Sequence, residues 1–179
     1  MNVVETELPG VKIIEPRIFE DKRGFFLEVY NEARYHEAGI DIRWLQDNHS
    51  KSRKGTLRGL HYQVENAQDK LVWAVKGEAF DVAVDIRPGS ATFGKWTGVV
   101  LSAEKKNQIL VPKGFAHGFC VLSDECEIMY KCSDVYNREG EGGIIWNDPT
   151  IGIDWPISDP ILSDKDAALP TLDKARMYP

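Results

Sequence analysis

The sequence predicts an all-β fold, a sandwich or barrel of short strands, and three observations support this prediction. Apolar residues occupy alternate positions through most of the stretch from Leu71 to Arg87, as in strands that bury one face. Turn signals recur about every eight to twelve residues, which is typical of sandwiches and barrels. The clearest helix pattern is short, and it runs from a capping Asn31 through Ala38 to a stop at Gly39.

The expected strands follow one another along the chain with turns between them. Extended segments are expected at residues 11–19, interrupted by Pro16, and at 25–30, with a turn at 21–24. A polar run at 46–50 leads into a basic loop at 51–54. Residues 71–75 and 80–86 are expected to form a hairpin around Lys76-Gly77-Glu78. The remaining strands are expected at 96–101, 108–111, 118–122 and 127–132.

Turns and short helices are expected after Trp146, where several prolines interrupt the chain. No linker, repeat or low-complexity stretch is present. A single domain spanning 1–179 is therefore the simplest organisation.

Length and composition narrow the class of protein. A chain of 179 residues can bury a sizeable core, and 42% hydrophobic with 28% charged residues is ordinary for a globular domain. The formal net charge of −6 argues against a nucleic-acid partner held by general electrostatics. No apolar run reaches the roughly 18–20 residues of a membrane helix, and the N-terminus lacks a signal-peptide core. The three cysteines lack metal-ligand spacing, which fits thiols in a reducing cytoplasm, the expected location.

Two of the four histidines lie in stretches that indicate a functional site. The run Gly55-Thr56-Leu57-Arg58-Gly59-Leu60-His61-Tyr62-Gln63 resembles the first motif of cupins, and Pro112-Lys113-Gly114-Phe115-Ala116-His117 resembles the second. In cupins these motifs lie on strands that face each other inside a jelly-roll barrel, so the resemblance implies a cupin-type jelly roll.

Metal-binding cupins need three or four ligands, and here Gln63 occupies the place of the second histidine. Two histidines alone make a poor site for a divalent transition metal. We therefore expect no metal and no cofactor, and a histidine that is free for acid–base chemistry. Two neutral, hydrogen-bonded core histidines are the alternative.

A free histidine base needs a carboxylate that fixes its tautomer and stabilises the imidazolium. Asp81, Asp85 and Asp166 are the candidates. Asp166 follows Ser163 by three residues, which is also the pattern of a helix start. A further condition comes from strand geometry, because Arg58 and His61 point to opposite faces of a regular strand unless a bulge re-aims one of them.

Basic residues suggest an anionic ligand. Arg23, Arg58 and Lys70 each lie near an expected strand end beside glycine or polar residues. Arginine can bind a phosphate in bidentate fashion. Solvated surface charge is the alternative reading of the same residues.

Many separate motifs, in order from about Gly10 to about Leu169, resemble the dTDP-4-dehydrorhamnose 3,5-epimerase family of dTDP-L-rhamnose synthesis. The matching stretches are Arg23-Gly24-Phe25-Phe26-x-Glu28, Gln46-Asp47-Asn48-x-Ser50, Leu57-Arg58-Gly59-Leu60-His61-Tyr62-Gln63, Lys70-Leu71-Val72, Asp85-Ile86-Arg87, Thr92-Phe93-Gly94, Pro112-x-Gly114-Phe115-Ala116-His117-Gly118-Phe119, Tyr130-Lys131-Cys132, Tyr136, Trp146-Asn147-Asp148-Pro149 and Leu162-Ser163-x-Lys165-Asp166.

The resemblance implies a role for each matching position. His61 would be the base that removes a proton from carbon, and Asp166 would be its partner. Tyr130 would deliver a proton to the opposite face, and Lys70 would support the enolate oxygen. Tyr136 matches an aromatic residue that stacks on thymine. The positions that match contacts to the nucleotide sugar are Arg23, Glu28, Gln46, Asp47, Asn48, Arg58, Lys70, His117, Glu141 and Lys165.

The resemblance also implies a metal-free homodimer in which N-terminal strands cross to the partner, so that Arg23 and Glu28 complete the other subunit's site. The implied reaction inverts C3 and C5 of dTDP-4-dehydro-6-deoxy-D-glucose to give dTDP-4-dehydro-L-rhamnose. Epimerases of one carbon and keto-sugar isomerases share much of the motif set. A metal-dependent cupin oxygenase and a nucleotide-sugar-binding module without turnover are alternatives of other classes.

Overall fold

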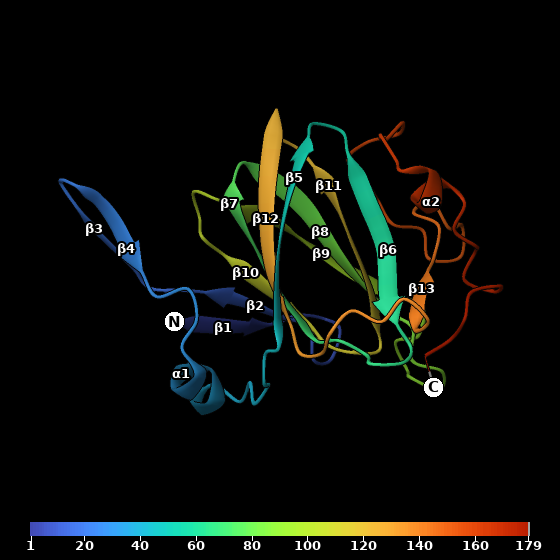
Figure 1. Cartoon of the computed structure of the whole chain (residues 1–179), viewed down its shortest axis with the longest axis horizontal. Helices are drawn as coiled ribbons and strands as arrows, with labels where there is room; N and C mark the ends of the chain where they lie inside the picture. Colours follow the sequence, from blue (N-terminus) through green and yellow to red (C-terminus); the bar gives the residue numbers. More distant parts are fainter. Residues whose placement is uncertain (179) are drawn as a thin grey trace.

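Two antiparallel β-sheets form the body of the protein, for which a computed structural model describes residues 1–178 (Figure 1). The six-stranded sheet has the order β1 (Asn2–Glu5), β2 (Lys12–Glu15), β10 (Gln108–Val111), β7 (Lys70–Lys76), β12 (Glu125–Cys132) and β5 (Gln46–Arg53). The five-stranded sheet has the order β13 (Glu141–Gly143), β6 (Leu57–Gln63), β11 (Phe115–Val121), β8 (Glu78–Asp85) and β9 (Trp96–Ser102). The all-β prediction is confirmed.

The sheets pack face to face over an apolar interior. Val72 and Ile128 of the six-stranded sheet lie in one buried cluster with Ala83, Phe119 and other residues of the five-stranded sheet. The opposite faces are covered too, because Leu71 and Trp73 pack near helix α1 and Val82 packs against C-terminal segments. Burying a side chain of this size stabilises the fold by about 1.5–3 kcal/mol. The central strands are therefore apolar on both faces.

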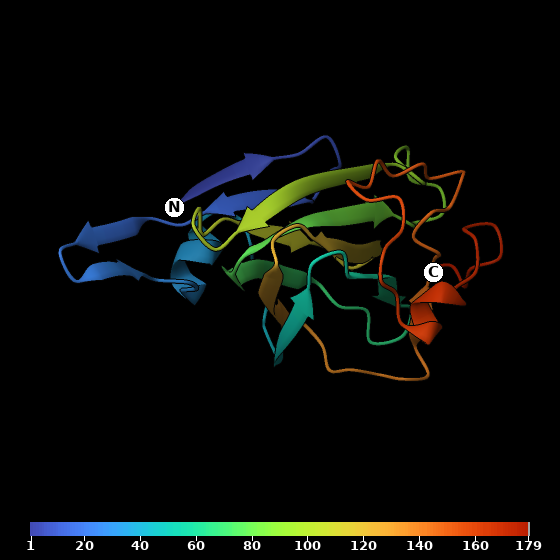
Figure 2. The same ribbon diagram turned by 90° about the horizontal axis from the view of Figure 1, so that it is seen from above.

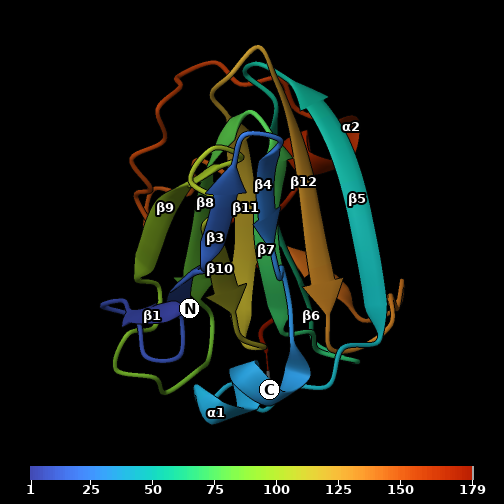
Figure 3. The same cartoon turned by 90° about the vertical axis from the view of Figure 1, so that its left-hand side faces the viewer.

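Two features project from or flank this body. The hairpin of β3 (Ile18–Asp21) and β4 (Gly24–Leu27) extends away from both sheets, as Figures 1 and 2 show, and it lies in front of them in Figure 3. Helix α1 (Glu32–Glu37) follows it, with Asn31 as the predicted N-cap and Ala38 as the C-cap. Helix α2 (Asp164–Ala167) lies beside β6 in the C-terminal region. Among the described residues, no helix is long and apolar enough to cross a membrane.

Three expectations about the strands are wrong. The polar run and the basic loop together form one strand, β5, which extends to Arg53 and pairs with β12 along its whole length. The expected strand at 25–30 ends earlier, at Leu27. The expected hairpin at 71–86 is instead a crossing between sheets: β7 pairs with β10 and β12, whereas β8 pairs with β11 and β9. Gly77 makes this corner with a φ of 70°, a conformation that favours glycine.

The two cupin-like motifs also lie differently from the expectation. They do not face each other across the interior, because β6 and β11 are neighbours in the five-stranded sheet and His61 is the register partner of His117. The two histidines are therefore next to each other on one wall.

Candidate active site

A groove lies between the six-stranded and five-stranded sheets, and it consists of two cavities that share His61, Lys70 and Tyr130. One cavity has a volume of about 400 Å³ and extends toward helix α2. The other has a volume of about 390 Å³ and extends toward Tyr136. The shared residues therefore mark the centre of an elongated site, which could hold an elongated ligand with one part in each cavity.

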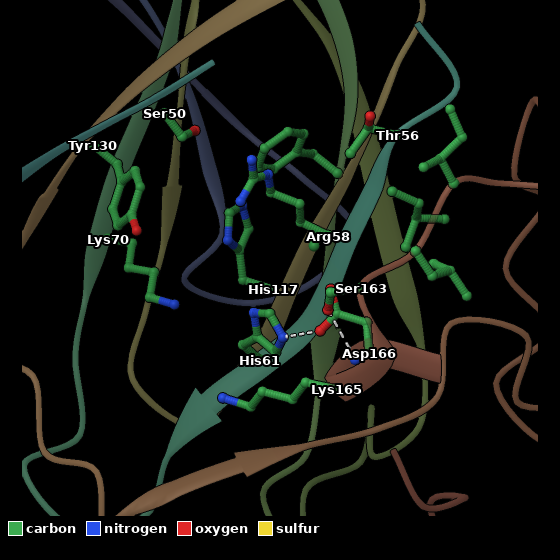
Figure 4. Close-up of a pocket in the computed structure, with 15 residues that line it drawn as sticks. Ser50, Thr56, Arg58, His61, Lys70, His117, Tyr130, Ser163, Lys165 and Asp166 are labelled. Atoms are coloured by element: carbon green, nitrogen blue, oxygen red, sulfur yellow. Dashed lines mark hydrogen bonds and ion pairs between the residues drawn. The ribbon is translucent and has the colours of Figure 1, made fainter. Parts of the chain in front are cut away.

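The centre contains the expected histidine–carboxylate pair. His61 Nε2 lies 2.6 Å from Asp166 Oδ1 (Figure 4). Burial would raise the pKa of the Asp166 carboxyl, but hydrogen bonds from His61, Ser163 and the Gly59 backbone, with the charge of His61, lower it overall. Because an ionised carboxylate can only accept, Nε2 of neutral His61 carries the proton and Nδ1 keeps its lone pair. The arrangement suits a general base.

Asp166 serves the helix and the histidine together. Its backbone N–H donates to Ser163 Oγ at 3.1 Å, which caps the first turn of α2 as the sequence pattern indicates. Its carboxylate points the other way, toward β6, and only 5% of the side chain is exposed. The two readings of this aspartate are therefore compatible.

A bulge in β6 resolves the problem of strand geometry. The register runs from His61 opposite His117 to Arg58 opposite Phe119, so β6 carries one extra residue in this interval. Gly59 in the bulge has a φ of 118°, and a Cβ there would lie 2.7 Å from the backbone of β11. The extra residue re-aims the strand, and both Arg58 and His61 line the same cavity.

Tyr130 and Lys70 line the opposite wall, on β12 and β7 of the six-stranded sheet, and Figure 4 shows both side chains directed toward His61. Burial raises the pKa of Tyr130, reinforced by Cys132 and opposed by Arg58, so the phenol holds its proton. Burial lowers the pKa of Lys70, against the opposing effect of Cys132, Asp81 and Glu141. The Tyr130 phenol and the Lys70 amine thus face His61 across the groove.

A second histidine–carboxylate pair lies beside the first. His117 Nε2 lies 2.9 and 3.0 Å from the two oxygens of Asp81, and both residues are buried. Of the other carboxylates considered, Asp85 accepts from Arg87, Ser90 and Thr92. Each of the three candidate aspartates thus has a different partner.

The other end of the groove holds a linked polar group. The Tyr136 hydroxyl donates to Glu141 Oε2 at 3.0 Å, and Lys165 Nζ lies 2.6 Å from Glu141 Oε1. Burial would raise the pKa of Glu141, but these two hydrogen bonds and the charges of Lys165 and His61 lower it. Gln46 and Asn48, on alternate positions of β5, line the same cavity.

Three of the predicted contact residues lie away from the groove. Arg23 is at the tip of the projecting hairpin, where it pairs with Asp21 and 84% of its side chain is exposed. Glu28 pairs with Arg34 near α1. Asp47 points to the opposite face of β5 from Gln46 and Asn48, and its carboxylate accepts from Lys131. Within this chain, the structure does not bring these three to the site.

The cupin resemblance places Gln63 where metal-binding cupins carry the second histidine and implies no other role for it, yet Gln63 is buried and lines the groove. Asp81, a candidate partner for the histidine base, pairs with His117 and not with His61. Within residues 1–178, no three His, Cys, Asp or Glu side chains form a group that could hold a metal ion.

The fold and the groove define a jelly-roll protein of the cupin type whose pocket carries paired acid–base groups. The comparisons give the family. The model of the dTDP-4-dehydrorhamnose 3,5-epimerase family matches residues 5–174. The dTDP-4-dehydrorhamnose 3,5-epimerase of Shigella flexneri is 60% identical over 168 residues, which cover 93% of each chain. The chain belongs to this family, as its motifs indicated.

Solved structures agree with this assignment. The dTDP-6-deoxy-D-glucose-3,5-epimerase of Legionella pneumophila, in complex with dTDP-4-keto-L-rhamnose, has a TM-score of 0.94 and 53% identity, covering 97% of this chain and 93% of that one. A 3'-monoepimerase from Streptomyces bikiniensis, in complex with dTDP-quinovose, has a TM-score of 0.89 and 35% identity, covering 95% and 87%. The expected cupin-type jelly roll is thereby confirmed.

Proposed function

We propose that the protein inverts C3 and C5 of dTDP-4-dehydro-6-deoxy-D-glucose to give dTDP-4-dehydro-L-rhamnose, a step of dTDP-L-rhamnose synthesis. One observation carries the proposal beyond family membership. A base, His61, and a protonated phenol, Tyr130, line the same cavity from opposite sheets, with the Lys70 ammonium beside them. Inversion at carbon needs such an arrangement, because one proton leaves from one face and another arrives at the opposite face.

Proton removal is the task of His61. Carbons 3 and 5 flank the 4-keto group, so their C–H bonds are acidified, although they remain far less acidic than imidazolium. The base must therefore lie against the hydrogen and ionise near the operating pH. Nδ1 of His61 takes the proton, and the Asp166 carboxylate 2.6 Å from Nε2 stabilises the imidazolium that forms.

Lys70 stabilises the charge that develops on the sugar. As the proton leaves, negative charge moves from carbon to the C4 oxygen, and a nearby cation meets it there. A donor of this kind lowers the barrier by about 2.7–4 kcal/mol in comparable sites. The partly desolvated ammonium suits the task, because electrostatic interactions strengthen where water is excluded.

Tyr130 completes the inversion. Its raised pKa keeps the phenolic proton in place until the enolate carbon accepts it on the face opposite His61. The phenolate then regains a proton from solvent, and His61 releases its own, so each cycle returns both groups to their starting states. Repeating the cycle at the second carbon gives the 3,5-epimer.

The remaining groove residues hold the nucleotide. Arg58, His117 and Lys165 place positive or hydrogen-bonding groups along the first cavity, which suits a diphosphate. Tyr136, with Gln46, Asn48 and Glu141, lines the second cavity, which suits a nucleoside. Binding energy from these remote parts fixes the sugar ring against the base and the acid.

Deuterium incorporation tests the function directly. The purified protein is incubated with dTDP-4-dehydro-6-deoxy-D-glucose in heavy water, and the product is followed by NMR. Deuterium at both C3 and C5 with the L-rhamno configuration is the expected result. Deuterium at only one carbon would make the protein a monoepimerase, and binding of dTDP without any exchange would make it a binding module.

We further propose a homodimer in which the β3–β4 hairpin reaches the partner's groove. Phe25 and Phe26 of this hairpin are 56% and 69% exposed, an apolar surface that a partner subunit would bury. The hairpin also carries Arg23, and Glu28 follows it, which would bring both predicted contacts to the partner's site. Mixing inactive Arg23→Ala and His61→Ala chains should restore turnover, since mixed dimers regain one complete site. No recovery after demonstrated subunit exchange would contradict strand exchange.

A further inference from the structure

Gln63 is a buried side chain of the groove whose amide bonds only to loops. It lies on β6 two residues after His61, and 7% of it is exposed. Its Nε2 donates to the carbonyl of Asn66 at 2.6 Å and to that of Val135 at 3.3 Å. Its Oε1 accepts from the backbone N–H of Asn137 at 2.9 Å. One amide thus fastens two separate loops to the wall that carries the base.

Two of these hydrogen bonds hold the main chain on either side of Tyr136. Gln63 bonds to the carbonyl of Val135, the residue before Tyr136, and to the N–H of Asn137, the residue after it. The N–H of Tyr136 itself donates to Gln46 Oε1 at 2.9 Å, from the other sheet. The segment 135–137 is therefore suspended between the two walls of the groove by one glutamine from each.

We propose that Gln63 is a positioning residue for nucleoside recognition, holding this segment so that the Tyr136 ring is presented to the thymine base. The inference rests on the proposed function, in which Tyr136 is the stacking platform. Because Tyr136 is 56% exposed, few packing contacts fix it, and its place depends on these backbone bonds together with the bond from its hydroxyl to Glu141. An aromatic ring that is held before binding loses less conformational freedom when the base stacks on it.

The chemistry of the position calls for an amide. The two loops offer two carbonyls and one N–H, so the side chain must donate twice and accept once. Glutamine has both functions, whereas glutamate has no donor when ionised and methionine has neither function in useful strength. A side chain that loses these bonds leaves the carbonyls of Asn66 and Val135 and the N–H of Asn137 without this partner.

Strand geometry places Gln63, which holds the two loops, on the same wall as His61. Residues two apart in a strand point to the same side, so Gln63 and His61 share one wall. The Tyr136 hydroxyl bonds to Glu141, which pairs with Lys165, the neighbour of Asp166. The nucleoside end of the groove is therefore fixed to the same elements, β6 and α2, that carry His61 and Asp166. Binding of the nucleoside there can help to hold the sugar against His61.

A double-mutant cycle on dTDP affinity tests the inference, using the full-length protein with Gln63→Met, Tyr136→Ala and both changes. Calorimetric titration with dTDP should give affinity roughly tenfold weaker for Gln63→Met, a loss typical of a net hydrogen bond. Tyr136→Ala should weaken affinity by roughly ten- to hundredfold, as for loss of base stacking. In the double variant, Gln63→Met should add less than about twofold, because the ring it positions is gone.

Kinetics and a control separate positioning from general destabilisation. Gln63→Met should raise KM for the dTDP-sugar about tenfold and change kcat by less than about threefold. Asn107→Leu is the matched control, because Asn107 is another buried amide with two backbone bonds, in the turn before β10. It should lower the unfolding midpoint and leave dTDP affinity unchanged.

Each failure has its own signature. Wild-type dTDP affinity in Gln63→Met, or effects of Gln63→Met and Tyr136→Ala that simply multiply, would overturn the positioning role. Unchanged dTDP affinity in Tyr136→Ala would instead overturn the stacking role assumed in the proposed function.

Discussion

Two histidine–carboxylate pairs occupy adjacent strands of the same wall, and they differ in origin, geometry and burial. His61 on β6 reaches Asp166 on a short helix 105 residues later, through one oxygen at 2.6 Å. His117 on β11 meets Asp81 on the neighbouring strand β8, through both oxygens at 2.9 and 3.0 Å. The side chain of His61 is 31% exposed, whereas that of His117 is 9% exposed.

In the proposed mechanism, this difference separates the base from a histidine that serves as a fixed contact. A base must gain and lose protons, so its ring needs an open nitrogen and a partner that stabilises the cation without enclosing it. The His61 pair has that form. A pair enclosed in the sheet, with both carboxylate oxygens engaged, is held in one geometry and serves better to place a donor or acceptor. Removing the first histidine should therefore affect chemistry, and removing the second should affect stability.

The largest expected effect is on turnover in His61→Ala. Loss of the base should lower kcat by on the order of 10²- to 10⁴-fold, the usual contribution of general base catalysis. Affinity for dTDP should stay within about twofold, because the nucleotide contacts remain. Steady-state rates and calorimetric titration check both. Turnover near that of the wild type would remove His61 from the mechanism.

Tyr130→Phe probes the opposite wall. Without the phenolic proton, removal by His61 continues but delivery to the other face fails. The variant should still exchange substrate hydrogens with heavy water, while product formation falls by about 10²-fold. NMR measures exchange and inversion in one experiment. Loss of exchange together with inversion would assign Tyr130 a role in the first proton transfer.

The next effect is on stability, in His117→Leu. This change leaves the fully buried Asp81 without its donor, and breaking a buried pair costs about 3–5 kcal/mol. His61→Ala should cost clearly less, since that ring is partly exposed. Urea unfolding of both variants gives the two free energies of unfolding. Equal losses would mean that the two pairs do not divide the tasks as described.

The strands that the sequence predicted well are rich in apolar residues. Residues 96–101 and 108–111 became β9 and β10 almost as expected, because apolar and β-branched residues in a short run between turns indicate a buried strand. β5 was missed because its pattern is polar throughout: Gln46, Asn48 and Ser50 face the groove and charged residues face solvent. Hydrophobic periodicity cannot detect a strand whose inner face lines a polar site.

Local sequence patterns could not predict which strands pair with each other. β7 and β8 alternate like the arms of a hairpin, yet they belong to different sheets, and only contacts distant in sequence decide this. The bulge at Gly59 is a similar case, because one extra residue changes which side chains share a face. By contrast, the motifs led directly to His61, Lys70, Tyr130 and Asp166, which the structure brings together.

The smallest expected effect is the pH dependence of stability in Asp166→Asn. The folded pKa of Asp166 is lowered below its ordinary value of 3.8, so the carboxylate contributes stability that is fully present above pH 3.8. That contribution is lost as the pH falls through the lower, folded pKa. The wild type should therefore exceed Asp166→Asn in free energy of unfolding at pH 7, and this difference should shrink below pH 3.8.

Urea unfolding from pH 7 to about pH 3 measures the difference, and Asp164→Asn is the control. Asp164 is an exposed carboxyl on the same helix, so its replacement changes the helix charge without touching His61. A difference between wild type and Asp166→Asn that stays constant with pH would mean that the carboxylate does not draw its stability from the imidazole. In that case the proposed electrostatic difference between the partly exposed pair and the enclosed pair would be wrong.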